Sequence, residues 1–128
     1  MPRVLVVDDE DQIRGLLQNI LVRAGHEVHT ANSVQAAIEM CGPPAPFDVV
    51  VTDVVMPGMD GHELARWLAD RCPNMRVILM SGFDPGCEEC PYADNCHRLP
   101  KPFAPQDLAA LVSEVLAQPI RPRRPQKG

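Results

Sequence analysis

A run of hydrophobic residues that ends on a carboxylate constrains the fold of this chain more than any other feature. Val49, Val50 and Val51 lead through Thr52 to Asp53, and a turn sequence rich in Pro and Gly follows. An unbroken apolar run of this length predicts a strand that is buried on both faces, as in a parallel sheet covered by helices. Such a strand would deliver Asp53 to the carboxyl edge of the sheet, where open α/β folds place their ligands.

Other apolar segments also end on polar residues. The runs at residues 4–7 and 77–80 stop on acidic residues and on a serine, and a lysine follows a shorter apolar segment near residue 100. Because the carboxyl ends of parallel strands meet at one edge of a sheet, we expect these polar groups to converge. The groups expected at this edge are Asp8, Asp9, Asp53, Ser81 and Lys101.

The segments between these apolar runs show the periodicity of amphipathic helices. Apolar residues recur three and four positions apart in four segments, and turn residues separate them from the strands. Alternating strands and helices predict an α/β fold with a parallel sheet and right-handed crossovers. The predicted helices cover residues 11–24, 34–40, 61–71 and 105–116, and a further short strand is predicted over residues 27–31.

Length and composition limit the classes of protein to consider. The chain has 128 residues, 45% hydrophobic residues and a net charge of -5, which predicts one soluble globular domain without a general nucleic-acid-binding surface. No apolar run approaches the roughly 20 residues of a membrane span, so a cytoplasmic protein without a membrane partner is expected. We expect the domain to occupy residues 1–118, followed by a flexible tail rich in Pro and Arg over residues 119–128.

The order of the polar groups is that of a known family. The motifs are Asp8-Asp9, Asp53 with Met56-Pro57-Gly58-Met59-Asp60-Gly61 behind it, Ser81-Gly82, and Lys101-Pro102-Phe103. The chain resembles a response-regulator receiver domain of two-component signalling, of the chemotaxis-regulator type. The resemblance implies a doubly wound, flavodoxin-like fold with five parallel strands in the order 2-1-3-4-5.

The resemblance also implies a phosphorylation switch and not an enzyme. Asp53 would accept a phosphoryl group from a histidine kinase or a histidine phosphotransfer protein, while Ser81 and Lys101 contact the phosphoryl oxygens. The implied Mg²⁺ ligands are Asp8, Asp9, Asp53 and the backbone carbonyl of Val55. No output domain is recognised, so a stand-alone receiver is expected to signal by binding an unidentified downstream protein, and a homodimer is one arrangement that the family allows.

Three further positions bear on how such a switch would work. The side chains of Val55 and Phe83 stand where receivers control the access of water to the phosphoryl group. Both are apolar, which predicts slow self-dephosphorylation. Arg98 stands where family members usually carry an aromatic residue, which puts the usual aromatic switch in doubt. A cis peptide between Lys101 and Pro102 is also implied.

The stretch between Ser81 and Lys101 departs from the family pattern. Pro85, Gly86 and Pro91 interrupt any helical period, so the fourth helix of the family is predicted to be atypical or missing. Four soft ligands with the spacing C-x2-C-x5-C-H occur here, namely Cys87, Cys90, Cys96 and His97. They suit Zn²⁺ or an iron-sulfur cluster; a redox pair of the first two cysteines, or unliganded thiols, are the alternatives.

Two alternative functions remain open at this point. A degenerate receiver would sense metal or redox state through the cysteine-rich stretch. A magnesium-dependent phosphohydrolase with an aspartyl-phosphate intermediate uses the same residue types. Enzymes that resemble the haloacid dehalogenase family, however, carry the nucleophile after the first strand, whereas here the acidic pair comes first and Asp53 later. The order of the motifs therefore favours a receiver.

Overall fold

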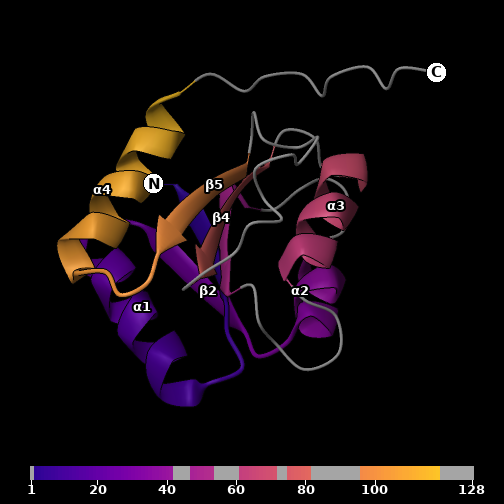
Figure 1. The fold of residues 1–128 in the computed structure, drawn as a ribbon, viewed down its shortest axis with the longest axis horizontal. Helices are drawn as coiled ribbons and strands as arrows, with labels where there is room; N and C mark the ends of the chain where they lie inside the picture. Colours follow the sequence, from indigo (N-terminus) through magenta and orange to yellow (C-terminus); the bar gives the residue numbers. More distant parts are fainter. Residues whose placement is uncertain (1, 42–46, 54–60, 72–74, 82–95, 119–128) are drawn as a thin grey trace.

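A computed structural model describes residues 2–41, 47–53, 61–71, 75–81 and 96–118. This part of the chain forms five strands and four helices, which alternate over most of the sequence (Figure 1). The strands are β1 (Arg3–Val7), β2 (Glu27–Ala31), β3 (Val49–Asp53), β4 (Arg76–Ser81) and β5 (Cys96–Pro100). The helices are α1 (Asp11–Arg23), α2 (Val34–Met40), α3 (Gly61–Arg71) and α4 (Pro105–Ala117).

The strands form a single sheet in which all neighbours are parallel. Their order is β2-β1-β3-β4-β5, which confirms the predicted order 2-1-3-4-5. Helices α1 and α4 cover one face of the sheet, and α2 and α3 cover the other (Figure 1). The structure is therefore a three-layer, doubly wound α/β fold. The carboxyl edge of its sheet is the edge at which the parallel strands end and the following loops begin.

Both faces of the central strands are buried, which explains the unbroken apolar runs. Val50 packs on the α2 and α3 side together with Leu64. Val49 and Val51 alternate to the opposite face and pack with Leu108 of α4. Because successive side chains of a strand point to opposite faces, a strand between two helical layers needs apolar residues at every position.

The predicted helix boundaries have identifiable local causes. Gly25 follows α1 with a φ of +96°, a conformation that glycine adopts at little cost at the end of a helix. Ser33 caps α2, because its hydroxyl oxygen accepts a hydrogen bond of 3.1 Å from the amide of Ala36. Pro105 begins α4, where the missing amide proton costs nothing.

Several predictions fall on residues that the structure does not describe. They concern the turn at residues 54–60, the segment at residues 82–95 with its atypical or missing fourth helix, and the tail at residues 119–128. The statements about Val55, Phe83, Cys87 and Cys90 therefore stay predictions. None of the helices in the described ranges has the length and apolar character needed to cross a bilayer.

Candidate functional site

The register of the sheet brings two of the predicted carboxylates side by side. Val7 of β1 is aligned with Thr52 of β3, so Asp8 and Asp53 are the next residues along two adjacent strands. Ser81 ends β4, the strand on the other side of β3, and its backbone lies at the same edge. These residues were expected to converge because each follows or ends an apolar run. They do so because β1, β3 and β4 are parallel, which brings their carboxyl ends to the same edge of the sheet.

Lys101 reaches the same edge from the end of β5. Its Nζ lies 2.9 Å from Oδ2 of Asp53, so the ammonium group and the carboxylate form a hydrogen-bonded ion pair. The side chain of Lys101 is 37% exposed and that of Asp53 only 14%. The peptide between Lys101 and Pro102 is cis, as the resemblance implied. A cation thus meets the central carboxylate at a site that is half open to solvent.

Asp8 is buried, with 1% of its surface exposed. Its amide donates to the carbonyl of Ala31 at 3.2 Å, and its own carbonyl accepts from Nη1 of Arg14 at 2.9 Å. Its Oδ1 accepts from the amide of Glu10 at 2.9 Å. Its Oδ2 is buried and has no hydrogen-bond partner within the described ranges. Buried acceptors are rarely left unpaired, so this oxygen requires an explanation.

The electrostatics around Asp8 favour the arrival of a cation. Burial raises the pKa of Asp8 above its ordinary value, and the nearby negative charges of Asp53 and Asp9 raise this pKa further. The amide of Glu10 and the ammonium group of Lys101 lower the pKa but do not reverse the shift. A bound divalent cation would favour the charged carboxylate and so oppose the effect of burial.

The donor atoms fit a hard cation that keeps water ligands. No three His, Cys, Asp or Glu side chains within the described residues are arranged so that they could hold a metal ion by themselves, and Asp9 is exposed. Mg²⁺ commonly takes one or two carboxylates and completes its octahedron with water and phosphate oxygens. The unpaired Oδ2 of Asp8, with Asp53 on the adjacent strand, fits this requirement. The carbonyl of Val55 lies outside the described residues.

The predicted soft-metal site receives no support from its described part. Cys96 and His97 are consecutive residues of β5, and consecutive strand positions belong to opposite faces of a sheet. His97 shares its face with Leu99, which packs with α4, and burial lowers the pKa of its imidazole. Glu114 of α4 acts against this shift.

Arg14 contacts the backbone of Asp8, a role that no motif in the sequence indicates. A backbone carbonyl leaves no trace in the sequence, and the spacing of three residues between Asp11 and Arg14 is also that of an ordinary exposed ion pair on a helix. Thr52 was likewise not singled out; its hydroxyl donates to the carbonyl of Asp53 at 3.0 Å. Both contacts hold the backbone that carries the acidic residues.

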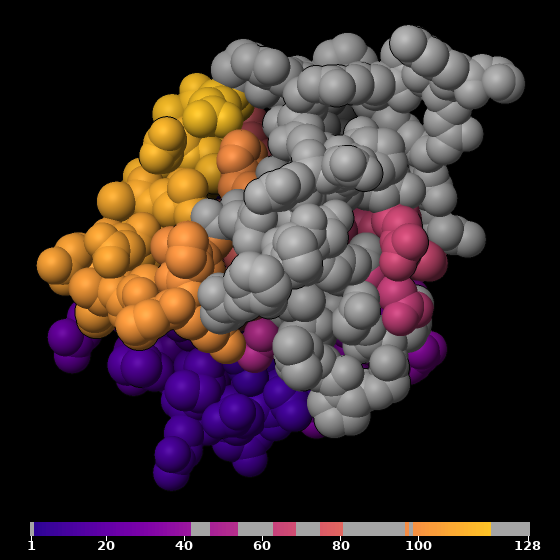
Figure 2. Space-filling model, in the orientation of Figure 1, coloured from indigo at the N-terminus to yellow at the C-terminus, as the bar shows by residue number. Residues whose placement is uncertain are grey.

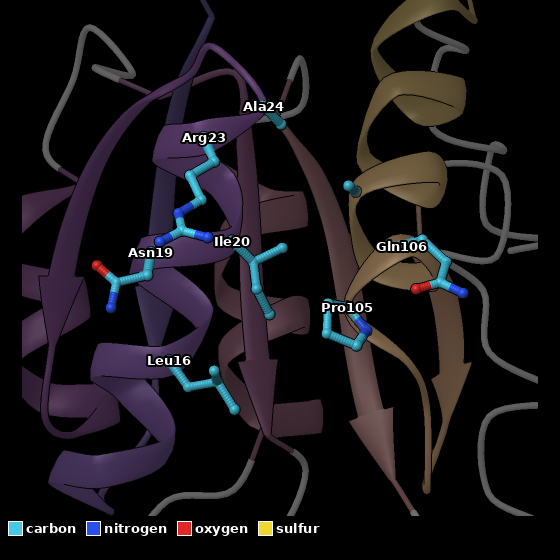
Figure 3. Close-up of a pocket in the computed structure, with 8 residues that line it drawn as sticks. Leu16, Asn19, Ile20, Arg23, Ala24, Pro105 and Gln106 are labelled. Carbon is cyan, nitrogen blue, oxygen red and sulfur yellow. The ribbon is translucent and has the colours of Figure 1, made fainter.

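A separate apolar groove runs between α1 and α4. The two helices lie against each other on one side of the molecule (Figure 2), and the groove has a volume of about 560 Å³. Leu16 and Ile20 project from α1 into the gap, opposite Pro105 of α4 (Figure 3). Leu16 is 52% exposed. The groove contains none of the predicted site residues.

Comparisons with known proteins agree with this geometry. The sequence profile of the response regulator receiver domain matches residues 4–113. The chain is 39% identical over 116 residues to the sensor kinase CckA of Brucella abortus, covering 88% of this chain and 12% of that protein. It is 32% identical over 119 residues to the response regulator receiver protein CpdR of the same organism, covering 91% of this chain and 98% of CpdR.

Lengths differ among these relatives. The chain spans 12% of CckA, 17% of the response regulator FleR of Pseudomonas aeruginosa and 48% of PetR of Rhodobacter capsulatus. The shared part is therefore one module of those larger proteins. The activities of the complete relatives do not transfer to this chain with the match.

Solved structures of response regulators have a similar fold. Chemotaxis protein CheY4 of Vibrio cholerae superposes with a TM-score of 0.79 at 30% identity, over 90% of this chain and 98% of CheY4. The response regulator TrrA of Thermotoga maritima, solved in complex with Mg²⁺-BeF, gives a TM-score of 0.79 at 29% identity, over 90% and 99% of the two chains. Receiver domains are signalling switches that histidine kinases or phosphotransfer proteins phosphorylate. This chain belongs to the response regulator receiver domain family.

Proposed function

We propose that this receiver accepts a phosphoryl group on Asp53 in the presence of Mg²⁺ and signals through phosphorylation-dependent binding of a partner protein. The ion pair of 2.9 Å between Lys101 and Asp53 supports this proposal most directly. In this pair an ammonium group contacts the carboxylate of Asp53, and the adjacent strand β1 leads to Asp8, whose buried Oδ2 has no partner among the described residues. The ammonium group can offset part of the negative charge of an incoming phosphoryl group, and a cation bound at Oδ2 of Asp8 would offset more of it.

The chemistry requires a nucleophile and neutralisation of charge. A carboxylate oxygen of Asp53 attacks the phosphorus atom of a phosphohistidine on the donor protein; the new O–P bond forms as the N–P bond breaks, and the released imidazole takes up a proton from solvent. Lys101 then pairs with a phosphoryl oxygen, and Ser81 donates a hydrogen bond to another. The ion, when bound, offsets the negative charge of the carboxylates and of the phosphoryl group. Its proposed protein ligands are Asp8, Asp9, Asp53 and the carbonyl of Val55.

The output is a change in the surface around the site. Phosphorylation adds close to two negative charges at the edge of the sheet, and the ammonium group of Lys101 has to exchange an oxygen of Asp53 for a phosphoryl oxygen. Lys101 joins β5 to α4, so these two elements are the nearest route from the site to a partner. The match over 98% of CpdR supports a receiver that works as a separate chain.

Intact-mass spectrometry with a small acyl-phosphate donor tests the proposal. We expect one phosphoryl adduct on the parent chain with Mg²⁺, none after chelation of Mg²⁺, and none on Asp53→Asn. Asp48→Asn is the matched control, because Asp48 is an exposed carboxylate at the start of the same strand, where its Oδ2 accepts a hydrogen bond from the amide of Arg3. This control should be labelled like the parent. Labelling of Asp53→Asn to the parent level, or no labelling of the parent, would contradict the proposal.

A further inference from the structure

Arg14 joins the two ends of the turn that carries Asp9. Its Nη1 donates to the carbonyl of Asp8 at 2.9 Å, and its Nη2 pairs with the carboxylate of Asp11. Its backbone amide donates to the carbonyl of Glu10 at 2.9 Å, in the first turn of α1. The side chain is 19% exposed, so most of it is packed against the protein. One guanidinium group therefore contacts the backbone just before Asp9 and the side chain of Asp11 just after it.

The contact with Asp8 completes a set of restraints on that residue. The amide of Asp8 is held by β2, its Oδ1 by the amide of Glu10, and its carbonyl by Arg14. Within the described part of the chain, Oδ2 is then the one polar atom of Asp8 without a partner. Each restraint limits the rotation of the residue, so the free oxygen keeps its direction. Arg14 supplies the restraint that comes from the helix.

We propose that Arg14 is a positioning residue for the divalent cation site. It sets the turn from β1 to α1, from which the carboxylates of Asp8 and Asp9 face the cation, without touching the cation itself. The inference rests on the proposed function, because it presupposes that these carboxylates hold Mg²⁺. A planar guanidinium group can donate to two oxygens in fixed directions at once, whereas the point charge of a lysine is not held in this way.

The sign of the effect separates positioning from simple electrostatics. Arg14 carries a positive charge close to an acidic site, and like charges repel. If its charge were all that mattered, removing it would strengthen the binding of Mg²⁺. If it positions the carboxylates, removing it weakens that binding although the local charge becomes more favourable. Replacing Arg14 by lysine preserves the positive charge but removes the planar guanidinium group that donates to two oxygens. The effect of charge and the effect of positioning can therefore be measured separately.

Calorimetric titration of Mg²⁺ into the parent and three variants tests the inference. We expect Arg14→Gln to weaken binding by about tenfold, as is typical when a group that orients a ligand is lost, and Arg14→Lys to recover at most part of the loss. Arg23→Gln is the matched control, because it removes the same charge from the same helix about 14 Å farther along its axis. Its affinity for Mg²⁺ should equal that of the parent.

The possible results distinguish a failure of the role proposed for Arg14 from a failure of the proposed function. Thermal unfolding without Mg²⁺ is measured in parallel, because a merely structural role of Arg14 would lower the melting temperature and leave the affinity of the folded chain unchanged. Unchanged or tighter binding by Arg14→Gln, with parent-like binding by Arg14→Lys, would overturn the inference and leave the proposed function standing. A parent chain that fails to bind Mg²⁺ at all would contradict the proposed function, and this inference with it.

Discussion

Two buried polar side chains, one before the start of α1 and one after its end, leave atoms without hydrogen-bond partners in the described structure. Asp8 lacks a partner for Oδ2, and His26 lacks partners for both ring nitrogens. Burial disfavours the charged form of each, so the pKa of Asp8 is raised and the pKa of His26 is lowered. By the criterion of an unpaired buried atom alone, the two residues are equivalent.

Their surroundings are different. The remaining polar atoms of Asp8 are held by hydrogen bonds, and the charges of Asp53 and Lys101 act on it. For His26, burial is the one cause of the pKa shift, and its amide donates to the carbonyl of Leu21 at 3.1 Å. An unpaired buried atom thus indicates a ligand site only where the residue is fixed and further charged ligands are near. Elsewhere it is a cost in stability.

The largest effect is expected from removing the carboxylate of Asp8. Asp8→Asn keeps an acceptor for the amide of Glu10 but loses the charged oxygen, so Mg²⁺ should bind more than tenfold more weakly in a calorimetric titration. His26→Gln is the matched control at the other end of α1 and should bind Mg²⁺ as the parent does. Equal Mg²⁺ affinities of Asp8→Asn and the parent would show that Asp8, like His26, is not a ligand of the cation.

A smaller effect is expected in the pH dependence of stability. The folded pKa of His26 lies below the unfolded value, so between these two values the unfolded chain binds more protons. The free energy of unfolding should therefore fall as the pH drops below about 6.5, the ordinary pKa of histidine, and level off below the folded pKa. His26→Leu should remove this contribution, which we expect to be about 1 kcal/mol.

Urea unfolding at pH 7.5 and pH 5 measures this contribution. His29→Gln is the control, because His29 is partly exposed and hydrogen-bonded to Glu27 at 3.0 Å. The control should lose at least as much stability between the two pH values as the parent, whereas His26→Leu should lose less. An identical loss in the parent and His26→Leu would show that the buried imidazole does not limit stability in acid.

The smallest effect on stability is expected for Lys101→Ala. The ion pair with Asp53 is half open to solvent, and such pairs contribute less than about 1 kcal/mol to folding. The urea midpoint should hardly move, while labelling by an acyl phosphate should become slower because the phosphoryl oxygens lose their cation. A loss of more than about 2 kcal/mol, with labelling unchanged, would assign Lys101 to the scaffold and not to the site.

The contrast between Asp8 and His26 also shows which structural features can be predicted from the sequence and which cannot. The strand that ends at Asp53 and the helix ends at Gly25 and Ser33 follow from local patterns, so they were predictable, whereas the sheet order was implied by the family resemblance. The meeting of Asp53 with Lys101 followed from strand order and family resemblance. The strand and the helix ends depend on apolar periodicity and on turn and capping residues, which can be read from a short stretch of sequence.

The remaining features depend on tertiary contacts that the sequence does not encode locally. The acceptor of Arg14 is a backbone carbonyl, and no local pattern marks the imidazole of His26, which follows a helix-terminating glycine, as buried. Cys96 and His97 appeared as neighbouring ligands in a loop, but pairing with β4 places them in a strand, where Val77 is aligned with Cys96. In each case the contacts of the residue are set by packing against neighbouring elements of the fold.

An amide chemical-shift titration with Mg²⁺ tests most directly whether the carboxyl edge of β1 and β3 is the cation site. We expect saturable shifts that centre on Asp8, Asp9 and Asp53, with the amide of His26 unchanged. Asp8→Asn should lose these shifts at the same concentrations of Mg²⁺. Shifts that never saturate, or that centre on residues away from this edge, would contradict the assignment of Asp8 as a cation ligand.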